Sequence, residues 1–122
     1  MSENILQKII DQKKTKIEKL KLEIDINSLL HAISEKDVFF DFKKKIQTKN
    51  SENKISIIAE IKKASPSAGI LIDDYDPVKI ANIYNSKNVT CLSVLTEEDF
   101  FLGNLSHISE IKKKIELPIL CK

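Results

Sequence analysis

The N-terminal part of the chain carries apolar residues at helical spacing. Across residues 3–24, isoleucine and leucine recur three, four and seven positions apart with lysines between them, and no Gly or Pro interrupts the segment. This pattern predicts a long amphipathic helix with a single apolar stripe. A second, shorter helix is predicted over 28–34, with Asn27 or Ser28 as its N-cap.

The pattern changes near residue 54. Apolar residues continue over 37–47, and the polar stretch 48–53 that follows predicts a connector. The segments 55–61, 89–95 and 117–121 are then short, nearly continuous apolar runs. Such runs are typical of strands that are buried on both faces.

Two amphipathic segments separate these three strands. Asp76 and Pro77 predict a helix start, with an acidic N-cap and a proline at the first helical position. Apolar residues three and four apart predict another helix over 105–115, after an acidic, aromatic loop at 96–103. Because short helical crossovers join parallel strands by right-handed connections, the sequence predicts an α/β fold with a parallel sheet.

Three parallel strands do not make a finished sheet. The strand at 117–121 would lack an outer neighbour, and an exposed apolar edge is a liability in a free-standing protein. We therefore expect the chain to be the front part of a longer protein, with completion of the sheet by a second copy or a partner as the alternative.

Composition removes several classes of protein. The chain of 122 residues is 42% hydrophobic and 31% charged, as in folded globular proteins. All 20 basic residues are lysine, and the net charge is +3 over residues 1–54 and −1 over 55–122, so no nucleic-acid partner is expected. Without a long apolar run or a signal-peptide core, we expect no membrane partner and a cytoplasmic location. Cys91 and Cys121 lie inside apolar runs, which disfavours a disulfide framework or a metal site.

Charged residues follow two of the predicted strands. Glu60 and Lys62 end the first strand on one face, because side chains alternate along a strand, and Lys122 follows the last strand at the same level. Reactive groups of parallel β/α sheets gather at such strand ends. A glutamate and two lysines there would favour an anionic substrate, and a desolvated lysine can act as a general acid. Since lysine is the commonest charged residue of this chain, solvated strand ends explain the same pattern.

Four blocks of sequence resemble one enzyme family in register. Residues 57–69, IIAEIKKASPSAG, resemble the first-strand signature of indole-3-glycerol-phosphate synthases. Residues 73–84, 93–103 and 117–122 resemble that family's first βα loop and helix, its second strand with an aromatic loop, and its third strand. The opening residues 5–9 resemble its N-terminal extension, so the likeness covers the whole chain.

The resemblance implies a TIM (β/α)8 barrel. Residues 1–48 would form a helical extension across the catalytic face, and residues 49–122 the first part of an incomplete barrel. The implied reaction is the ring closure of 1-(2-carboxyphenylamino)-1-deoxyribulose 5-phosphate, a small-molecule phosphosugar–anthranilate substrate. It loses carbon dioxide and water to give indole-3-glycerol phosphate in tryptophan biosynthesis, as a carboxy-lyase without metal or cofactor.

The resemblance also implies roles for single residues. Lys122 matches the general-acid lysine, Lys62 a second active-site lysine that contacts the substrate, and Glu60 the glutamate that orients it. Substrate-contacting positions fall on Ser65, Pro66, Phe100 and Phe101. From the residues alone, Ser65 and Pro66 are equally explained as part of a turn, and the two phenylalanines as residues that anchor their loop to the core.

The chain departs from the family pattern in two residues and in length. Ala68 stands where many members carry Lys or Arg, so any contact made there is lost. Cys121 is similar to the residue of bifunctional enzymes, in which a phosphoribosylanthranilate isomerase barrel follows on the same chain. A complete barrel takes about 250 residues, so we expect these residues alone to have no synthase activity. The alternative is a non-catalytic half-barrel or interaction module.

Overall fold

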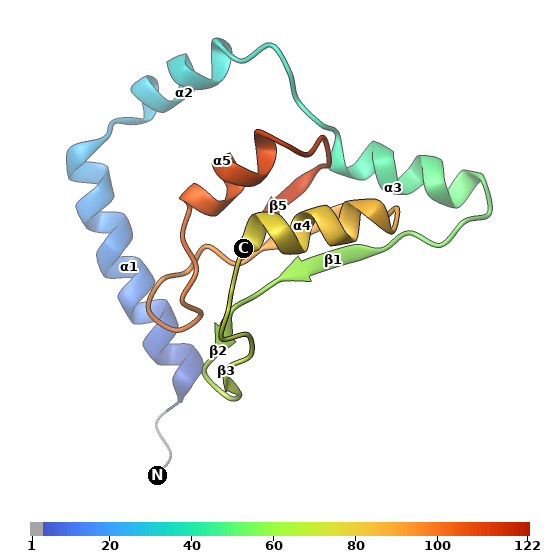
Figure 1. The fold of residues 1–122 in the computed structure, drawn as a ribbon. Coiled ribbons are helices and arrows are strands. Elements are labelled where there is room, and N and C mark those ends of the chain that lie inside the picture. The colour runs from blue at the N-terminus through green and yellow to red at the C-terminus, as the bar shows by residue number, and fades with distance from the viewer. Residues whose placement is uncertain (1–3) are drawn as a thin grey trace. The chain divides into compact units, whose positions relative to one another are not determined.

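The computed structural model describes residues 4–122, and it divides into two compact units after Phe39. Figure 1 shows the elements in chain order. They are α1 (Ile5–Glu23), α2 (Ile26–Ser34), α3 (Phe42–Ser51), β1 (Ile58–Ile61), β2 (Ala64–Ser65), β3 (Gly69–Ile70), α4 (Pro77–Ser86), β4 (Cys91–Val94), α5 (Ser106–Lys112) and β5 (Ile119–Cys121).

The first unit contains α1 and α2. The helix predicted over 3–24 is confirmed as α1, although residue 3 lies outside the described residues. Helix α2 begins earlier than predicted, because its N-cap is Asp25 and not Asn27 or Ser28. The carboxylate of Asp25 accepts the backbone N–H groups of both of those residues, at 2.8 and 3.1 Å, which satisfies two donors of the first turn.

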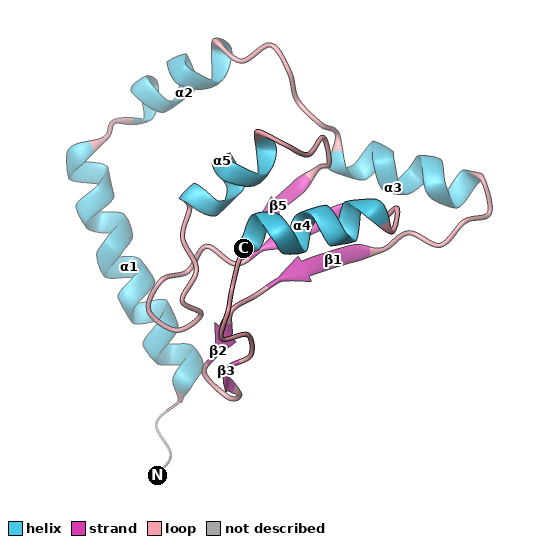
Figure 2. Cartoon of the chain, viewed as in Figure 1, coloured by secondary structure: helices cyan, strands magenta, loops and turns pink. Residues whose placement is uncertain are grey.

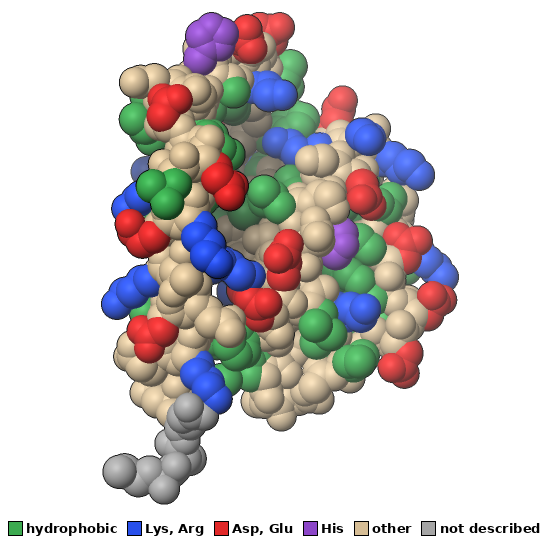
Figure 3. Space-filling view, turned by 90° about the vertical axis from the view of Figure 1, so that its left-hand side faces the viewer, with side chains coloured by type: hydrophobic (Ala, Val, Ile, Leu, Met, Phe, Trp, Pro, Cys, Tyr) green, Lys and Arg blue, Asp and Glu red, His purple; other side chains and the backbone are tan. Residues whose placement is uncertain are grey.

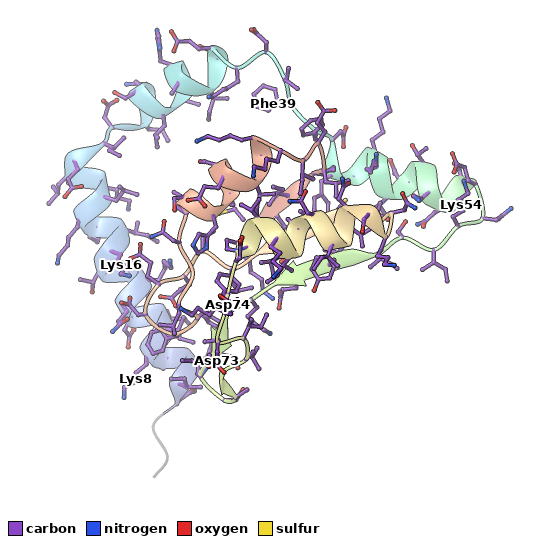
Figure 4. The ribbon with its side chains drawn as sticks, in the orientation of Figure 1. Lys8, Lys16, Phe39, Lys54, Asp73 and Asp74 are labelled. Atoms are coloured by element: carbon purple, nitrogen blue, oxygen red, sulfur yellow. The ribbon has the colours of Figure 1, made fainter. Side chains whose placement is uncertain are left out.

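The connector predicted over 48–53 is wrong, because α3 continues through most of it to Ser51. Asp41 caps the start of α3 by accepting the N–H of Lys44 at 2.9 Å. A largely polar segment can remain helical when one face of the helix packs against the protein, as the partly buried Phe42, Ile46 and Lys49 do here. Here the carbonyl oxygen of Phe42 lies 3.9 Å from the sulfur of Cys91 in β4. Lys54 lies in the turn that follows the helix (Figure 4).

Helix α3 belongs to the second compact unit. The boundary predicted between residues 48 and 49 falls inside this helix, whereas the observed units divide after Phe39. Besides the contact of Phe42 with Cys91, the hydroxyl of Ser56 donates to the carbonyl of Ile46 at 3.2 Å. These contacts connect α3 to β4 and to the segment before β1. The assignment of residues 1–48 to a separate extension stays a prediction.

The predicted parallel sheet is present, with β4 between β1 and β5. Ile61 pairs with Val94 on one side of β4, and Val94 with Cys121 on the other. Helices α4 and α5 cover one face of this sheet (Figure 2). The core between them contains the fully buried Leu92 and Ile111, so the helix–strand alternation in the sequence correctly locates the core.

The opposite face of the sheet is more open. Because side chains alternate, the residues between the core positions point away from α4 and α5; they are Ile58, Glu60, Cys91, Ser93 and Leu120. Ile58 and Leu120 are each 48% exposed. The strand predicted over 55–61 is therefore shorter than expected, and it is not buried on both faces.

Charge is spread over the surface without a single-sign patch on the face that Figure 3 shows, where lysines and acidic side chains are interspersed. In the described part of the chain, no helix has both the length and the apolar character needed to cross a membrane.

Candidate active site

Glu60 lies between two lysines where β1 and β5 end. The Nζ of Lys62 is 3.1 Å from Oε1 of Glu60, and the Nζ of Lys122 is 2.8 Å from Oε2. The side chains of Glu60 and Lys62 are about 30% exposed, and that of Lys122 is 55% exposed. The structure thus brings together the three charged residues that the sequence places at strand ends, while their chemical roles stay predictions.

The backbone of the sheet determines this convergence. Lys122 directly follows β5, and its N–H donates to the carbonyl of Val94 at 3.0 Å. The carbonyl of Lys122 accepts both the N–H of Thr96, at 2.7 Å, and the Thr96 hydroxyl, at 2.9 Å. Three hydrogen bonds therefore hold the main chain of Lys122 against the end of β4, and its side chain reaches back across the sheet to Glu60.

The lysines keep the carboxyl of Glu60 ionised. Burial raises the pKa of this carboxyl, but hydrogen bonds from Lys122 and Lys62, together with their charges, outweigh burial and lower the pKa below its ordinary value. With two lysines and one glutamate, the formal charge of the cluster is +1. An anion that approaches this end of the sheet would meet a net positive site with a fixed negative centre.

Ser93 and Thr96 also belong to this site, although the sequence does not predict roles for them. Ser93 lies opposite Glu60 on β4, is 4% exposed, and donates its hydroxyl to Oε2 of Glu60 at 3.4 Å. A hydroxyl within the mostly apolar segment 89–95, which also contains Thr90, was the available signal, because buried polar side chains need partners.

The loop after β1 forms a small hairpin that the sequence does not predict. Ala64 pairs with Ile70, and Ser65 with Gly69, in the antiparallel strands β2 and β3. Gly69 has a φ of +68°, a conformation that favours glycine. The Ser65 hydroxyl accepts the N–H of Ala68 at 3.2 Å and lies 3.5 Å from the Ser67 hydroxyl.

The structure does not join this hairpin to Glu60 by a hydrogen bond. The side-chain hydrogen bonds of Ser65 stay within the hairpin, and Pro66 is exposed at its tip. The loop that continues from β3 to α4 carries the exposed Asp73 and Asp74 (Figure 4). It ends at Asp76, the predicted N-cap of α4, which accepts the N–H of Lys79 at 2.9 Å.

The predicted aromatic loop is organised by Glu97. Its carboxylate accepts the backbone N–H groups of Asp99, Phe100 and Phe101 at 3.1, 2.7 and 3.2 Å. The carbonyl of Glu97 accepts the N–H of Gly103 at 2.7 Å, which closes the loop. Both phenylalanine side chains are partly buried. These hydrogen bonds stay within the loop, so the structure gives Phe100 and Phe101 fixed positions but no bond to the lysines.

Acidic, histidine and cysteine side chains do not cluster into a metal-binding group of three or more within residues 4–122. The chemistry that the described residues offer is that of two ammonium groups, a carboxylate and a hydroxyl. Such groups can bind an anion and transfer protons.

A parallel strand–helix sheet with charged side chains at the carboxyl ends of its strands is typical of β/α enzymes. Within that class, the family model of indole-3-glycerol phosphate synthase matches residues 6–122. The chain belongs to the indole-3-glycerol phosphate synthase family. The resemblance predicted from its four sequence blocks is confirmed.

Relatives named indole-3-glycerol phosphate synthase match nearly the whole chain. The protein of Desulforamulus reducens is 42% identical over 118 residues, which cover 97% of this chain and 43% of that protein. The protein of Microcystis aeruginosa is 37% identical over 120 residues, covering 98% and 40%. That of Bacillus licheniformis is 39% identical over 118 residues, covering 97% and 42%. The chain thus spans about two fifths of the length of these relatives.

Proposed function

We propose that this chain supplies the lysine–glutamate part of an indole-3-glycerol-phosphate synthase active site. The observation that carries the proposal is the position of Glu60, which lies within 3.1 Å of Lys62 and 2.8 Å of Lys122 at the carboxyl ends of β1 and β5. Family membership supports the reaction, and the geometry supports the residues.

The proposed reaction is the ring closure of 1-(2-carboxyphenylamino)-1-deoxyribulose 5-phosphate. A carbon–carbon bond forms between the aromatic ring and the ketone carbon, while Lys122 donates a proton to the ketone oxygen. Carbon dioxide then leaves the ring carbon, and loss of the new hydroxyl as water gives indole-3-glycerol phosphate. Lys62 would contact the substrate and assist these proton transfers, and Glu60 would hold both lysines in place.

The loops would complete the pocket around the substrate. Ser65 and Pro66 would contact the substrate from the hairpin after β1, and Phe100 and Phe101 would form a wall beside its ring. The ordered state of the Phe100–Phe101 loop, held by Glu97, supports a positional role for these two rings.

The proposal extends to the complete fold. Residues 58–121 would be the first three barrel strands with their helices, and the N-terminal helices an extension of the barrel, in a cytoplasmic enzyme of tryptophan biosynthesis. The isomerase barrel suggested by Cys121 stays a prediction. The coding sequence after Lys122 tests it directly.

A chimera tests the function. Residues 1–122 are joined to the part of the Desulforamulus reducens relative that follows its matched region, and the formation of indole-glycerol phosphate is followed by its ultraviolet absorbance. We expect turnover in the chimera, and a loss of about 10²–10⁴-fold in kcat for Lys122→Met, as for removal of a general acid.

Lys63→Met is the matched control, because Lys63 is the residue next to Lys62, whereas the ion pairs of Glu60 are with Lys62 and Lys122. It should leave turnover within a few-fold of the parent. If Lys122→Met retains full activity in a folded chimera, the proposed role of this lysine is wrong.

The same assay on the 122-residue chain alone distinguishes the alternative function. We expect no turnover from it. A discrete dimer by light scattering, together with an inactive chimera, would favour a non-catalytic interaction module instead.

A further inference from the structure

The carboxylate of Glu60 has an uneven set of donors. Oε1 accepts from Lys62, whereas Oε2 accepts from both Lys122, at 2.8 Å, and the hydroxyl of Ser93, at 3.4 Å. If Lys122 engages a substrate as proposed above, its ammonium group must turn away from Oε2. The oxygen then loses its shorter hydrogen bond in a partly buried position, where an unpaired charge is costly.

Ser93 is the donor that stays at Oε2. It lies in the middle strand of the sheet, directly opposite Glu60, and is 4% exposed. Its side chain has a single rotatable bond to the hydroxyl oxygen, whereas lysine has four and the Lys122 side chain is 55% exposed. On the far side of Ser93 the register partner is Leu120, which offers no polar group.

The hydroxyl of Ser93 has no competing partner. In the described chain its hydrogen bond goes to Glu60, and a buried hydroxyl without that bond would be unsatisfied. At 3.4 Å the bond is long compared with the usual 2.5–3.0 Å or so for O–H···O. It can therefore shorten when Lys122 leaves and Oε2 becomes a better acceptor.

We propose that Ser93 is a positioning residue, whose hydroxyl keeps Glu60 ionised and correctly oriented while Lys122 binds the substrate. Ser93 transfers no proton and touches no substrate in this role. The proposal rests on the proposed function, because Lys122 has to leave Glu60 during turnover. It predicts that Ser93 acts on the carboxyl of Glu60 even in the absence of substrate.

A carbon-13 NMR titration of the Glu60 carboxyl in the 122-residue chain tests this coupling. Ser93→Ala should raise the pKa of Glu60, because the hydroxyl that lies 3.4 Å from Oε2 of the charged form is lost. Ser93→Thr keeps a hydroxyl and should restore the parent value. An unchanged titration in folded Ser93→Ala overturns the proposal.

Thr90→Val is the matched control. Thr90 is also buried, lies immediately before β4, and accepts the N–H of Ile57 with its hydroxyl at 3.0 Å. Its loss should reduce stability and leave the titration of Glu60 unchanged. If Thr90→Val shifts Glu60 as much as Ser93→Ala does, the effect is general loosening of the sheet and the proposal fails. Should Ser93→Ala not fold, Ser93→Cys, a weaker donor of similar size, replaces it.

Kinetics of the chimera provide the second measurement. Ser93→Ala should lower kcat about tenfold with little change in KM, and should move the acidic limb of the kcat–pH profile to higher pH. Ser93→Thr should recover both kcat and the pH profile. The two proposals fail separately. Full activity of Lys122→Met would remove the proposed function, whereas the titration of Glu60 would still decide whether Ser93 supports its charge.

Discussion

Gly103→Ala should be one of the most damaging small substitutions in the chain. A Cβ atom at this position would overlap the carbonyl oxygen of Leu95 and lie 2.7 Å from its carbonyl carbon. Ordinary contact begins at 3.4 Å, and both atoms belong to backbone at the end of the buried β4 segment. Neither neighbour can rotate away as a side chain would, so the loop itself must move by about 1 Å.

The structure gives the size of the effect. Displacement of Gly103 breaks its 2.7 Å hydrogen bond to the carbonyl of Glu97, which contributes about 1 kcal/mol. Overpacking of a well-packed site adds about 1–3 kcal/mol, for a total near 2–4 kcal/mol. With a urea dependence of about 1.5 kcal/mol/M, the midpoint of unfolding should fall by about 1–3 M. Far-UV circular dichroism follows the transition, since the chain lacks tryptophan.

Gly69 is the matched control, because it needs glycine for a different reason. Nothing lies within 4 Å of a Cβ built there, but its φ is +68°. Gly69→Ala should therefore cost only about 1 kcal/mol, and Gly69→Asn less, since asparagine tolerates the left-handed conformation. Gly103→Asn should be as damaging as Gly103→Ala. The steric reasoning is refuted if Gly103→Ala unfolds within about 0.5 kcal/mol of the parent.

Three further predictions concern single side chains. Since the pKa of Glu60 is lowered in the folded chain, its contribution to stability is complete above the unfolded pKa near 4.5 and is lost as pH falls through the folded value. The difference in unfolding free energy between the parent and Glu60→Gln should therefore shrink between pH 7 and pH 3. A constant difference would contradict this. Tyr75→Phe should leave stability unchanged or raise it by up to about 1 kcal/mol in urea unfolding, because the Tyr75 hydroxyl is buried without a hydrogen-bond partner in the described structure. A loss of stability above about 1 kcal/mol would show that this hydroxyl has a hydrogen-bond partner. Ellman's reagent should modify the exposed Cys121 quickly and Cys91 only in urea, since Cys91 is fully buried and burial raises the pKa of its thiol. Rapid reaction of both thiols without urea would show that β4 opens readily.

Periodicity in the sequence was sufficient for most of the second unit. The apolar run around Cys91–Val94 and the Asp76–Pro77 helix start correspond closely to β4 and α4, because burial and capping are local signals. Helix α3 was not predicted, because residues 37–47 showed only an apolar stretch and the polar second half of the helix gives no periodic signal. The capping role of Asp25 was missed because two other acceptable caps follow it within three residues.

The candidate site was only partly predictable for a similar reason. Alternation along a strand places Glu60 and Lys62 on one face, and parallel strands place Lys122 at the same end. The sequence cannot give the register between strands, and the register is what puts Ser93 opposite Glu60 and Thr96 beside Lys122. Polar residues within predicted buried strands therefore merit inclusion in a candidate site before a structure is known.

The attachment of Lys122 to β4 has a consequence for the freedom of its side chain. Two main-chain hydrogen bonds and one from the Thr96 hydroxyl hold the backbone of Lys122 in place, whereas its half-exposed side chain can rotate about four single bonds. If Lys122 is the general acid proposed above, its ammonium group could follow the substrate oxygen as bonds rearrange, without any movement of the sheet. Arginine at the same position carries a larger, rigid guanidinium group, so it should be a poor replacement for Lys122 although it keeps the charge.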